Sequence, residues 1–165
     1  MCFYIKLRLN VRQYIKMADN SKEIIKAKLI QYAIALDARA WNHLNDIFHE
    51  DAVATYGNKD INFLIETKSR DEILQMCKDS LGGCGTTQHL LGNFRININA
   101  IEATSECYVR AYHIGLAANE HEFYEMYGEY QDKWKLFDGN WMIVKRNLRV
   151  DHESGNRDKV LAPGE

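Results

Sequence analysis

Several features that mark common protein classes are missing from this sequence. Its 165 residues include a single proline, Pro163, and four cysteines that form no Cys-x-x-Cys pair. Disulfide frameworks are typical of short secreted chains dense in cysteine, and structural metal sites need closely spaced ligands. Neither is therefore predicted, and we expect reduced thiols in a cytoplasmic protein.

Charge and hydropathy exclude two classes of partner. The formal net charge is -2, whereas nucleic-acid-binding proteins carry a clustered excess of lysine and arginine. No apolar run approaches the ~20 residues that cross a bilayer. The glycine-containing segment 81–85 lacks the residue order of a phosphate-binding loop. We therefore expect neither a nucleic acid nor a membrane as partner.

The N-terminal segment differs from the rest of the chain. Within residues 1–16 the segment 3–11 alternates apolar with polar or basic positions, which is typical of a strand, and the whole segment lacks the features of a signal peptide. We expect residues 1–17 to be an extension that precedes one domain of residues 18–152. The alternative is an added edge strand or an arm for oligomerisation. Residues 153–165 are expected to form a polar tail that frays.

The first half of the domain has the spacing of helices. Asn20 and Glu23 form a predicted capping box, and a buried stripe follows at three-and-four spacing. Its members are Ile25, Leu29, Tyr32, Ala33 and Leu36. A second short helix is expected over residues 41–48, a strand over 51–56, and a third helix from a Ser69–Glu72 capping box to about Ser80.

The second half alternates like long strands. We expect strands over residues 87–98, 106–116, 121–137 and 141–150, with a turn at Asp138-Gly139-Asn140 and a bulge or kink at Gly128. Helices followed by long antiparallel strands are typical of an α+β fold. The predicted architecture is a set of N-terminal helices packed on a strongly curved antiparallel sheet around one apolar pocket.

Strand alternation indicates which side chains share the inner face. His113 lies on the same face as Cys107, Val109 and Ala111. A second strand places four large side chains together, namely Tyr124, Met126, Tyr130 and Trp134. An aromatic, methionine-containing concave wall suits a flat apolar ligand, whereas plain core packing is the alternative interpretation.

A carboxylate and an imidazole are the candidate chemical groups. Asp37 continues an expected inward stripe of Ile30 and Ala33, and His89 begins the first long strand. A carboxylate that holds an imidazole in one tautomer makes it a positioned general base. The alternative is that Asp37 caps its helix and His89 is an ordinary strand histidine. Tyr32 and Tyr56 are candidate phenols that could donate to a substrate carbonyl.

The ordered set of motifs resembles the SnoaL-like branch of the nuclear transport factor 2-like superfamily. The matching segments are residues 32–41, 48–52, 87–93, 138–143 and 146–150, which together span about residues 20–151. This resemblance implies a cone-shaped α+β barrel. The enzymes that the chain resembles are scytalone dehydratase, bile acid 7α-dehydratase and lindane dehydrochlorinase, which remove a proton with an aspartate–histidine pair.

The resemblance also implies roles for individual residues. Asp37 would orient His89 as the base, Tyr32 matches a participating tyrosine of the bile acid enzyme, and Tyr56 and His113 match substrate- or water-positioning residues of scytalone dehydratase. Leu36, Gly128 and Tyr130 depart from the scytalone dehydratase pattern, which makes that substrate doubtful. Met126, Tyr130 and Trp134 remain candidates for substrate binding.

Two classes of function remain open. The first is a cofactor-free lyase or isomerase, similar to a dehydratase, that acts on a small, largely apolar cyclic substrate. The second is a non-catalytic ligand-binding or assembly module of the same fold. A metal site formed by Asp37, His89 and His113 is a weaker alternative, because the resembled enzymes use none. The relatives imply a homo-oligomer, with a trimer favoured over a dimer.

Overall fold

The computed structural model describes residues 11–161, and its side chains from Ala18 onward apart from Lys59. The helices are α1 (Val11–Asp37), α2 (Arg70–Leu81) and the short α3 (Arg157–Val160). The strands are β1 (Phe48–Asn58), β2 (Phe63–Thr67), β3 (Thr87–Asn99), β4 (Glu102–Ile114), β5 (Phe123–Phe137) and β6 (Asn140–Gly155). Short 3-10 turns cover Trp41–Asp46, Lys59–Ile61 and Ala117–Asn119.

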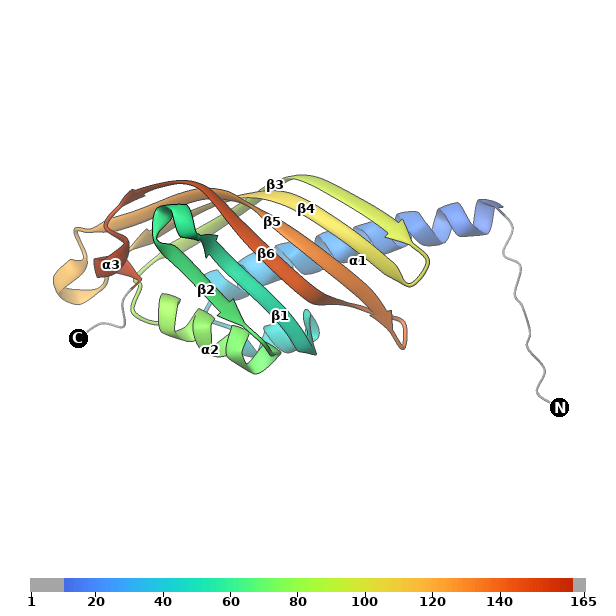
Figure 1. The fold of residues 1–165 in the computed structure, drawn as a ribbon, viewed down its shortest axis with the longest axis horizontal. Coiled ribbons are helices and arrows are strands. Elements are labelled where there is room, and N and C mark those ends of the chain that lie inside the picture. The colour runs from blue at the N-terminus through green and yellow to red at the C-terminus, as the bar shows by residue number, and fades with distance from the viewer. Residues whose placement is uncertain (1–10, 162–165) are drawn as a thin grey trace.

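The strands form one six-stranded sheet in the order β2-β1-β6-β5-β4-β3. The sheet curves around α1, and α2 lies against the β1–β2 edge (Figure 1). The predicted α+β class with a strongly curved sheet is confirmed. The sheet is mixed, however, because β1 pairs with β6 in parallel while the other neighbours are antiparallel. Local alternation does not define the direction of a partner strand, so the sequence did not reveal this pair.

Helix α1 begins earlier than expected. It starts at Val11 and passes through Asn20, so the predicted capping box at Asn20 is wrong. Val11, the last residue of the strand-like alternation, belongs to this helix. No glycine or proline interrupts residues 11–37, and the helix can therefore extend backward. Residues 1–10 of the predicted extension lie outside the described part of the chain.

The inner face of α1 is the expected one, with one exception. The stripe is fully buried, namely Ile25, Leu29, Tyr32, Ala33 and Leu36. Ile30 is 41% exposed, so the predicted inward stripe that joined Ile30 to Asp37 is wrong. A residue next to Leu29 is turned about 100° around the helix axis, which carries Ile30 away from the core. Asp37 lies four residues after the buried Ala33, so it stays near the inner face and is half-buried at the end of the helix.

Other boundaries follow the sequence in part. The Ser69 hydroxyl accepts from the Glu72 amide at 3.2 Å, as the predicted capping box requires. The second short helix is only the 3-10 turn Trp41–Asp46, and Phe48 already begins β1. The short strand β2 was not predicted. The segment from Glu153, which was expected to fray, completes β6 and forms α3, where Val160 is fully buried.

Gly128 marks a bend in the sheet, as expected. The register of the β5–β6 pair shifts between Tyr127 and Gly128. A Cβ atom at Gly128 would lie 2.2 Å from the Arg149 carbonyl oxygen, so only glycine permits this close approach. The bend helps β5 and β6 to wrap around the helices and leaves a concave inner face.

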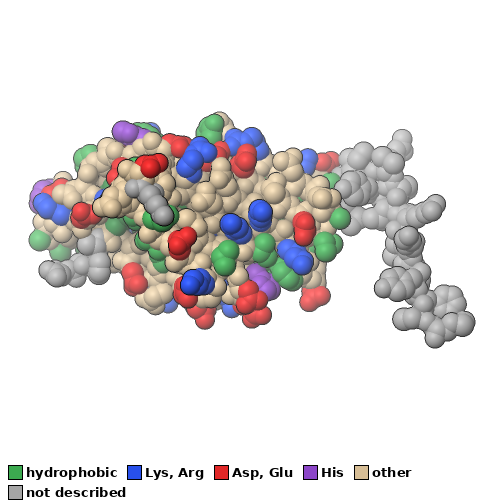
Figure 2. Space-filling model, in the orientation of Figure 1, with side chains coloured by type: hydrophobic (Ala, Val, Ile, Leu, Met, Phe, Trp, Pro, Cys, Tyr) green, Lys and Arg blue, Asp and Glu red, His purple; other side chains and the backbone are tan. Residues whose placement is uncertain are grey.

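The exterior agrees with the balanced charge of the chain. Positive and negative side chains are interspersed over the face shown in Figure 2. Among residues 11–161, no helix combines the length and the apolar character that are required to cross a membrane.

Candidate functional site

A small cavity lies between α1, α2 and the concave face of the sheet. Its volume is about 70 Å³, and apolar and aromatic side chains form most of its wall. The predicted site residues that line it are Tyr32, Tyr56, His89, His113, Met126 and Tyr130. The fold thus gathers residues from α1, β1, β3, β4 and β5 around one space.

Asp37 and His89 meet at one end of this cavity. His89 Nδ1 lies 2.7 Å from Asp37 Oδ1, and the His89 backbone amide donates to Asp37 Oδ2 at 2.9 Å. Thr87 Oγ1 donates to Asp37 Oδ1 at 3.0 Å. The expected proximity of Asp37 and His89 is therefore present in the structure, whereas their catalytic roles stay a prediction.

The surroundings of Asp37 favour its ionised form. Burial raises the pKa of this carboxyl, but the hydrogen bonds from His89 and Thr87 outweigh it and leave the pKa below its usual value. An ionised carboxylate can only accept, so His89 Nδ1 carries the proton in this pair. His89 Nε2 then has a free lone pair. The side chain of His89 is only 5% exposed, and its ring lines the cavity.

His113 lies beside His89 but is held differently. Its Nδ1 is 3.0 Å from the carbonyl oxygen of Tyr124, so Nδ1 donates and Nε2 is the basic atom. The two imidazole rings meet edge to face, with centroids 5.3 Å apart. Burial, followed by the neighbouring charge of His89, lowers the pKa of His113 to about 4. His113 is therefore neutral at physiological pH.

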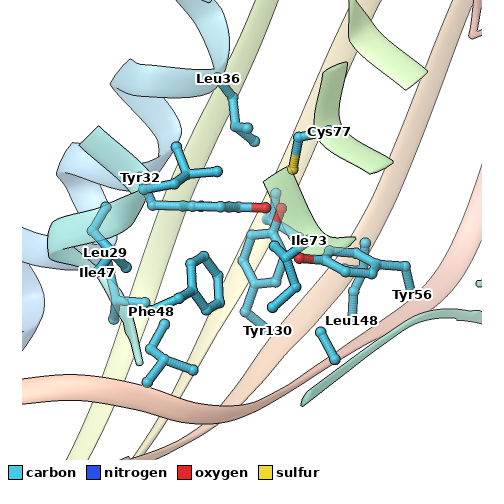
Figure 3. Packing of buried hydrophobic residues seen from close by; sticks show 14 of the residues in the cluster. Leu29, Tyr32, Leu36, Ile47, Phe48, Tyr56, Ile73, Cys77, Tyr130 and Leu148 are labelled. Carbon is cyan, nitrogen blue, oxygen red and sulfur yellow. The ribbon is translucent and has the colours of Figure 1, made fainter. Parts of the chain in front are cut away.

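Three phenols gather at another part of the cavity. Figure 3 shows Tyr32 from α1, Tyr56 from β1 and Tyr130 from β5 with their hydroxyl groups turned toward one another near Cys77. Burial raises the pKa of all three phenols, so they remain protonated donors. The buried Tyr56 hydroxyl makes no well-aligned hydrogen bond to the described side chains and backbone, although the neighbouring Tyr32 hydroxyl affects its pKa.

A buried ion pair supports these aromatic rings. Arg146 Nε and Nη2 donate to the two oxygens of Asp132, each at 2.8 Å, and both side chains are fully buried. The Arg146 guanidinium lies 4.1 Å from the ring centroid of Tyr32 and 4.3 Å from that of Tyr130. Arg146 was not among the predicted site residues, although strand alternation places Asp132 on the same face as Tyr130 and Trp134. Alternation of Arg146 with Leu148 and Val150 was the signal that could have revealed it.

Trp134 does not line the cavity. Its indole Nε1 donates to Ser105 Oγ at 2.8 Å, and the Ser105 hydroxyl lies 3.5 Å from Asp132 Oδ2. Trp134 therefore belongs to the polar cluster around Asp132 rather than to the wall of the cavity. Its predicted contact with substrate has no support in this placement.

The described chain brings potential metal ligands together at one place on its surface. Within residues 11–161, ligand atoms of three such residues gather only at His49, Glu50 and Asp51, which are consecutive and mainly solvent-exposed. Exposed acidic groups of this kind are common without an ion. Asp37, His89 and His113 do not form a group of this kind. Both Nδ1 atoms are already engaged, with Asp37 and with the Tyr124 carbonyl.

Similar folds occur in several solved structures. One is a protein of Novosphingobium aromaticivorans that carries the provisional name scytalone dehydratase, with 24% identity, a TM-score of 0.73, and coverage of 87% of this chain and 92% of that one. Another is the hexachlorocyclohexane dehydrochlorinase LinA-type3 of Novosphingobium barchaimii, with 18% identity, a TM-score of 0.70, and coverage of 87% and 95%. At these identities the likeness shows the fold alone.

Sequence comparisons add the family. No curated protein sequence matches the chain. The family model for the SnoaL-like domain matches residues 20–147, which is most of the chain and includes Asp37, His89 and His113. The protein belongs to the SnoaL-like domain family.

Proposed function

We propose that this protein is a cofactor-free lyase or isomerase that acts on a small, largely apolar cyclic substrate. The observation that carries the proposal is the 2.7 Å contact between Asp37 and His89 at the edge of an apolar cavity. A lone, solvated imidazole is a weak and mobile base. An imidazole fixed by a carboxylate presents its second nitrogen in one direction.

The proposed chemistry starts with proton removal. His89 Nε2 takes a C–H proton that a neighbouring carbonyl has made acidic, and Asp37 stabilises the resulting imidazolium. The Tyr56 hydroxyl, which makes no well-aligned hydrogen bond to the described residues, donates to the carbonyl oxygen as charge develops there. Tyr32 stays protonated and assists as a second donor. Proton transfer by a positioned base contributes roughly 10²–10⁴-fold in rate.

We propose that His113 positions the substrate, which is the role that the resemblance implies. A residue with a pKa of about 4 is almost entirely neutral near neutral pH and is a poor proton donor. We propose that His113 Nε2 accepts a hydrogen bond from a substrate hydroxyl. The His89 imidazolium, whose ring is the neighbour of His113, then returns its proton to that hydroxyl as it leaves as water. The net reaction is an elimination in which His89 ends as it began.

The size of the cavity restricts the substrate. Its volume of about 70 Å³ is smaller than the ~150 Å³ cavity that holds a benzene molecule in an engineered protein. A ring compound therefore requires some movement of the walls. Met126 and Leu161 line the cavity, and Leu161 is partly exposed at the C-terminal end of the described chain. Their displacement would enlarge the space without disturbing Asp37.

The test is hydrogen–deuterium exchange in a panel of small cyclic ketones and β-hydroxyketones, followed by NMR in D₂O. Exchange at the carbon next to the carbonyl reports proton removal even when elimination does not follow. We expect catalysed exchange by the native protein and a loss of about 10²-fold or more in His89→Gln. The exposed His43 provides a matched control, and His43→Gln should exchange at the native rate. Full turnover by a His89→Gln variant would reject the assignment.

The small cavity also favours a second candidate, a binding module without chemistry. In that case a cyclic ligand would bind at the cavity and be recovered unchanged, and His89→Gln would change affinity alone. The expected trimer or dimer stays a prediction under either function. Sedimentation equilibrium of the purified chain would measure the oligomeric state.

A further inference from the structure

Arg39 stands two residues beyond Asp37 in an unusual backbone conformation. Its φ angle is +57°, in the left-handed region where glycine usually ends a helix. A residue with a side chain in this region costs on the order of 1 kcal/mol or more. The sequence places arginine there, so the side chain should contribute something that glycine could not.

The Arg39 guanidinium connects three parts of the site. Nη1 donates to the Leu36 carbonyl at 2.6 Å and to Thr87 Oγ1 at 2.8 Å. Nη2 donates to the Gly85 carbonyl at 3.0 Å. Arg39 thus ties the end of α1 to the loop and strand that carry His89. Among the described residues it makes no salt bridge with a carboxylate.

The donors and acceptors of this network have only one consistent arrangement. A guanidinium has no acceptor, so Thr87 Oγ1 must accept from Arg39. The single hydroxyl proton of Thr87 is then available for Asp37 Oδ1, which lies 3.0 Å away. Asp37 receives three donors in total, from Thr87 and from the ring and the backbone of His89. This leaves His89 with its proton on Nδ1.

We infer that Arg39 is a positioning residue that acts through Thr87 to hold the Asp37 carboxylate in place and to fix the tautomer of His89. The inference rests on the proposed function only for its consequence in catalysis. Without Arg39, Thr87 Oγ1 loses the donor at 2.8 Å that fixes its orientation, and its hydroxyl proton is no longer held toward Asp37. Asp37 would then lose a donor and some of its orientation, and His89 would no longer be restricted to one arrangement.

The experiment is ¹⁵N NMR of the imidazole side chains in the full chain at neutral pH, with the His89 signals assigned from His89→Gln. In the native protein we expect a protonated Nδ1, an unprotonated Nε2 and a slowly exchanging Nδ1 proton. In Arg39→Met we expect exchange of that proton to accelerate about tenfold or more, as loss of a charge-assisted hydrogen bond implies. The Nε2–H tautomer should also become measurable.

Two further comparisons keep the result decisive. Thr87→Val removes the hydroxyl and should behave like Arg39→Met, whereas Thr87→Ser keeps it and should restore the native exchange rate. Arg110→Met is the matched control, because Arg110 lies on the outer face and pairs with Glu125. Native exchange and a native tautomer in Thr87→Val would overturn the inference, even if Arg39→Met failed to fold.

The readout also separates this inference from the proposed reaction, because the NMR signals need no substrate. Sensitivity of His89 to Arg39 and Thr87, together with no turnover of any cyclic ketone, would support the positioning role and reject only the function. Where a substrate is found, Arg39→Met should lower kcat and leave KM nearly unchanged, because Arg39 does not line the cavity. An effect on KM alone would contradict the positioning role.

Discussion

The rings of His89 and His113 meet edge to face at 5.3 Å, yet their Nδ1 atoms have opposite kinds of partner. His89 is paired with a carboxylate, whereas His113 is paired with a neutral backbone carbonyl. The Asp37 carboxylate can therefore balance a positive charge on the His89 ring, whereas no carboxylate pairs with the Nδ1 atom of His113. His89 is thereby suited to accept a proton, and His113 is suited to accept a hydrogen bond while it stays neutral.

The first prediction concerns acid stability. The unfolded chain protonates His113 as the pH falls below 6.5, but the folded chain resists protonation until about pH 4. The contribution of neutral His113 is therefore complete above pH 6.5 and is lost as the pH falls toward 4. The loss amounts to about 3 kcal/mol at most. Urea unfolding between pH 7 and 4 should show a shallower pH dependence in His113→Gln than in the native protein. His121→Gln, at an exposed site, should leave the dependence unchanged.

The second prediction concerns the free hydroxyl of Tyr56. Removal of a buried hydroxyl that lacks a partner should cost little stability, so Tyr56→Phe is expected to unfold within about 0.5 kcal/mol of the native protein, or to be more stable. Tyr124 is the matched control, since its hydroxyl donates to Glu153 at 3.0 Å, and Tyr124→Phe should cost about 1 kcal/mol. Chemical denaturation measures both. A large loss in Tyr56→Phe would indicate that its hydroxyl has a structural partner.

The third prediction concerns the buried ion pair. Asp132→Val leaves the Arg146 guanidinium buried without its carboxylate and should destabilise the fold by about 3–5 kcal/mol. The double variant Asp132→Val/Arg146→Met removes both charges and should be clearly more stable than Asp132→Val alone. A thermodynamic cycle from urea unfolding measures the coupling. If the double variant were as unstable as the sum of the single ones, the two residues would not act as a pair.

The fourth prediction compares two glycines in strands. Gly128→Ala places a Cβ atom 2.2 Å from the Arg149 carbonyl oxygen, so the bend must shift and stability should fall by several kcal/mol. Gly92 has open space around the same position, and Gly92→Ala should be neutral or stabilising by about 0.4–1 kcal/mol. Thermal unfolding of the two variants is the measurement. Equal melting temperatures would show that β5 does not need its bend.

The fold was largely predictable wherever a local signal decided it. The Ser69 capping box, the turn at Asp138 and the buried stripe of α1 all depend on residues a few positions apart. Asn20 had equally good spacing but lies inside α1. A capping signal carries no information about whether the preceding residues also form helix. The parallel pairing of β1 with β6 depends on contacts between distant segments, and β2 is only five residues long. No local sequence pattern predicted either of them.

In the candidate site, too, contacts between distant residues were harder to predict than local features. Asp37 and His89 lie 52 positions apart in the sequence, and residue spacing alone left open whether they met. The family resemblance supplied that expectation. The network around Asp37 was not predicted, because Thr87 and Arg39 resemble ordinary strand and helix-end residues in the sequence. Trp134 was expected at the cavity because alternation gives the face of a strand but not the position along it.

The place of β6 between β1 and β5 has a consequence for how the chain folds. The β1–β2 hairpin and the β3–β4–β5 meander form from neighbouring segments, but only β6 joins them into one sheet. During synthesis on the ribosome, the β1–β2 hairpin and the β3–β4–β5 meander cannot join into one sheet until β6 has been made. Contacts between such distant segments slow folding, so the two halves should expose their apolar inner faces until β6 arrives. Truncation within β6 should therefore yield aggregation rather than a smaller folded unit.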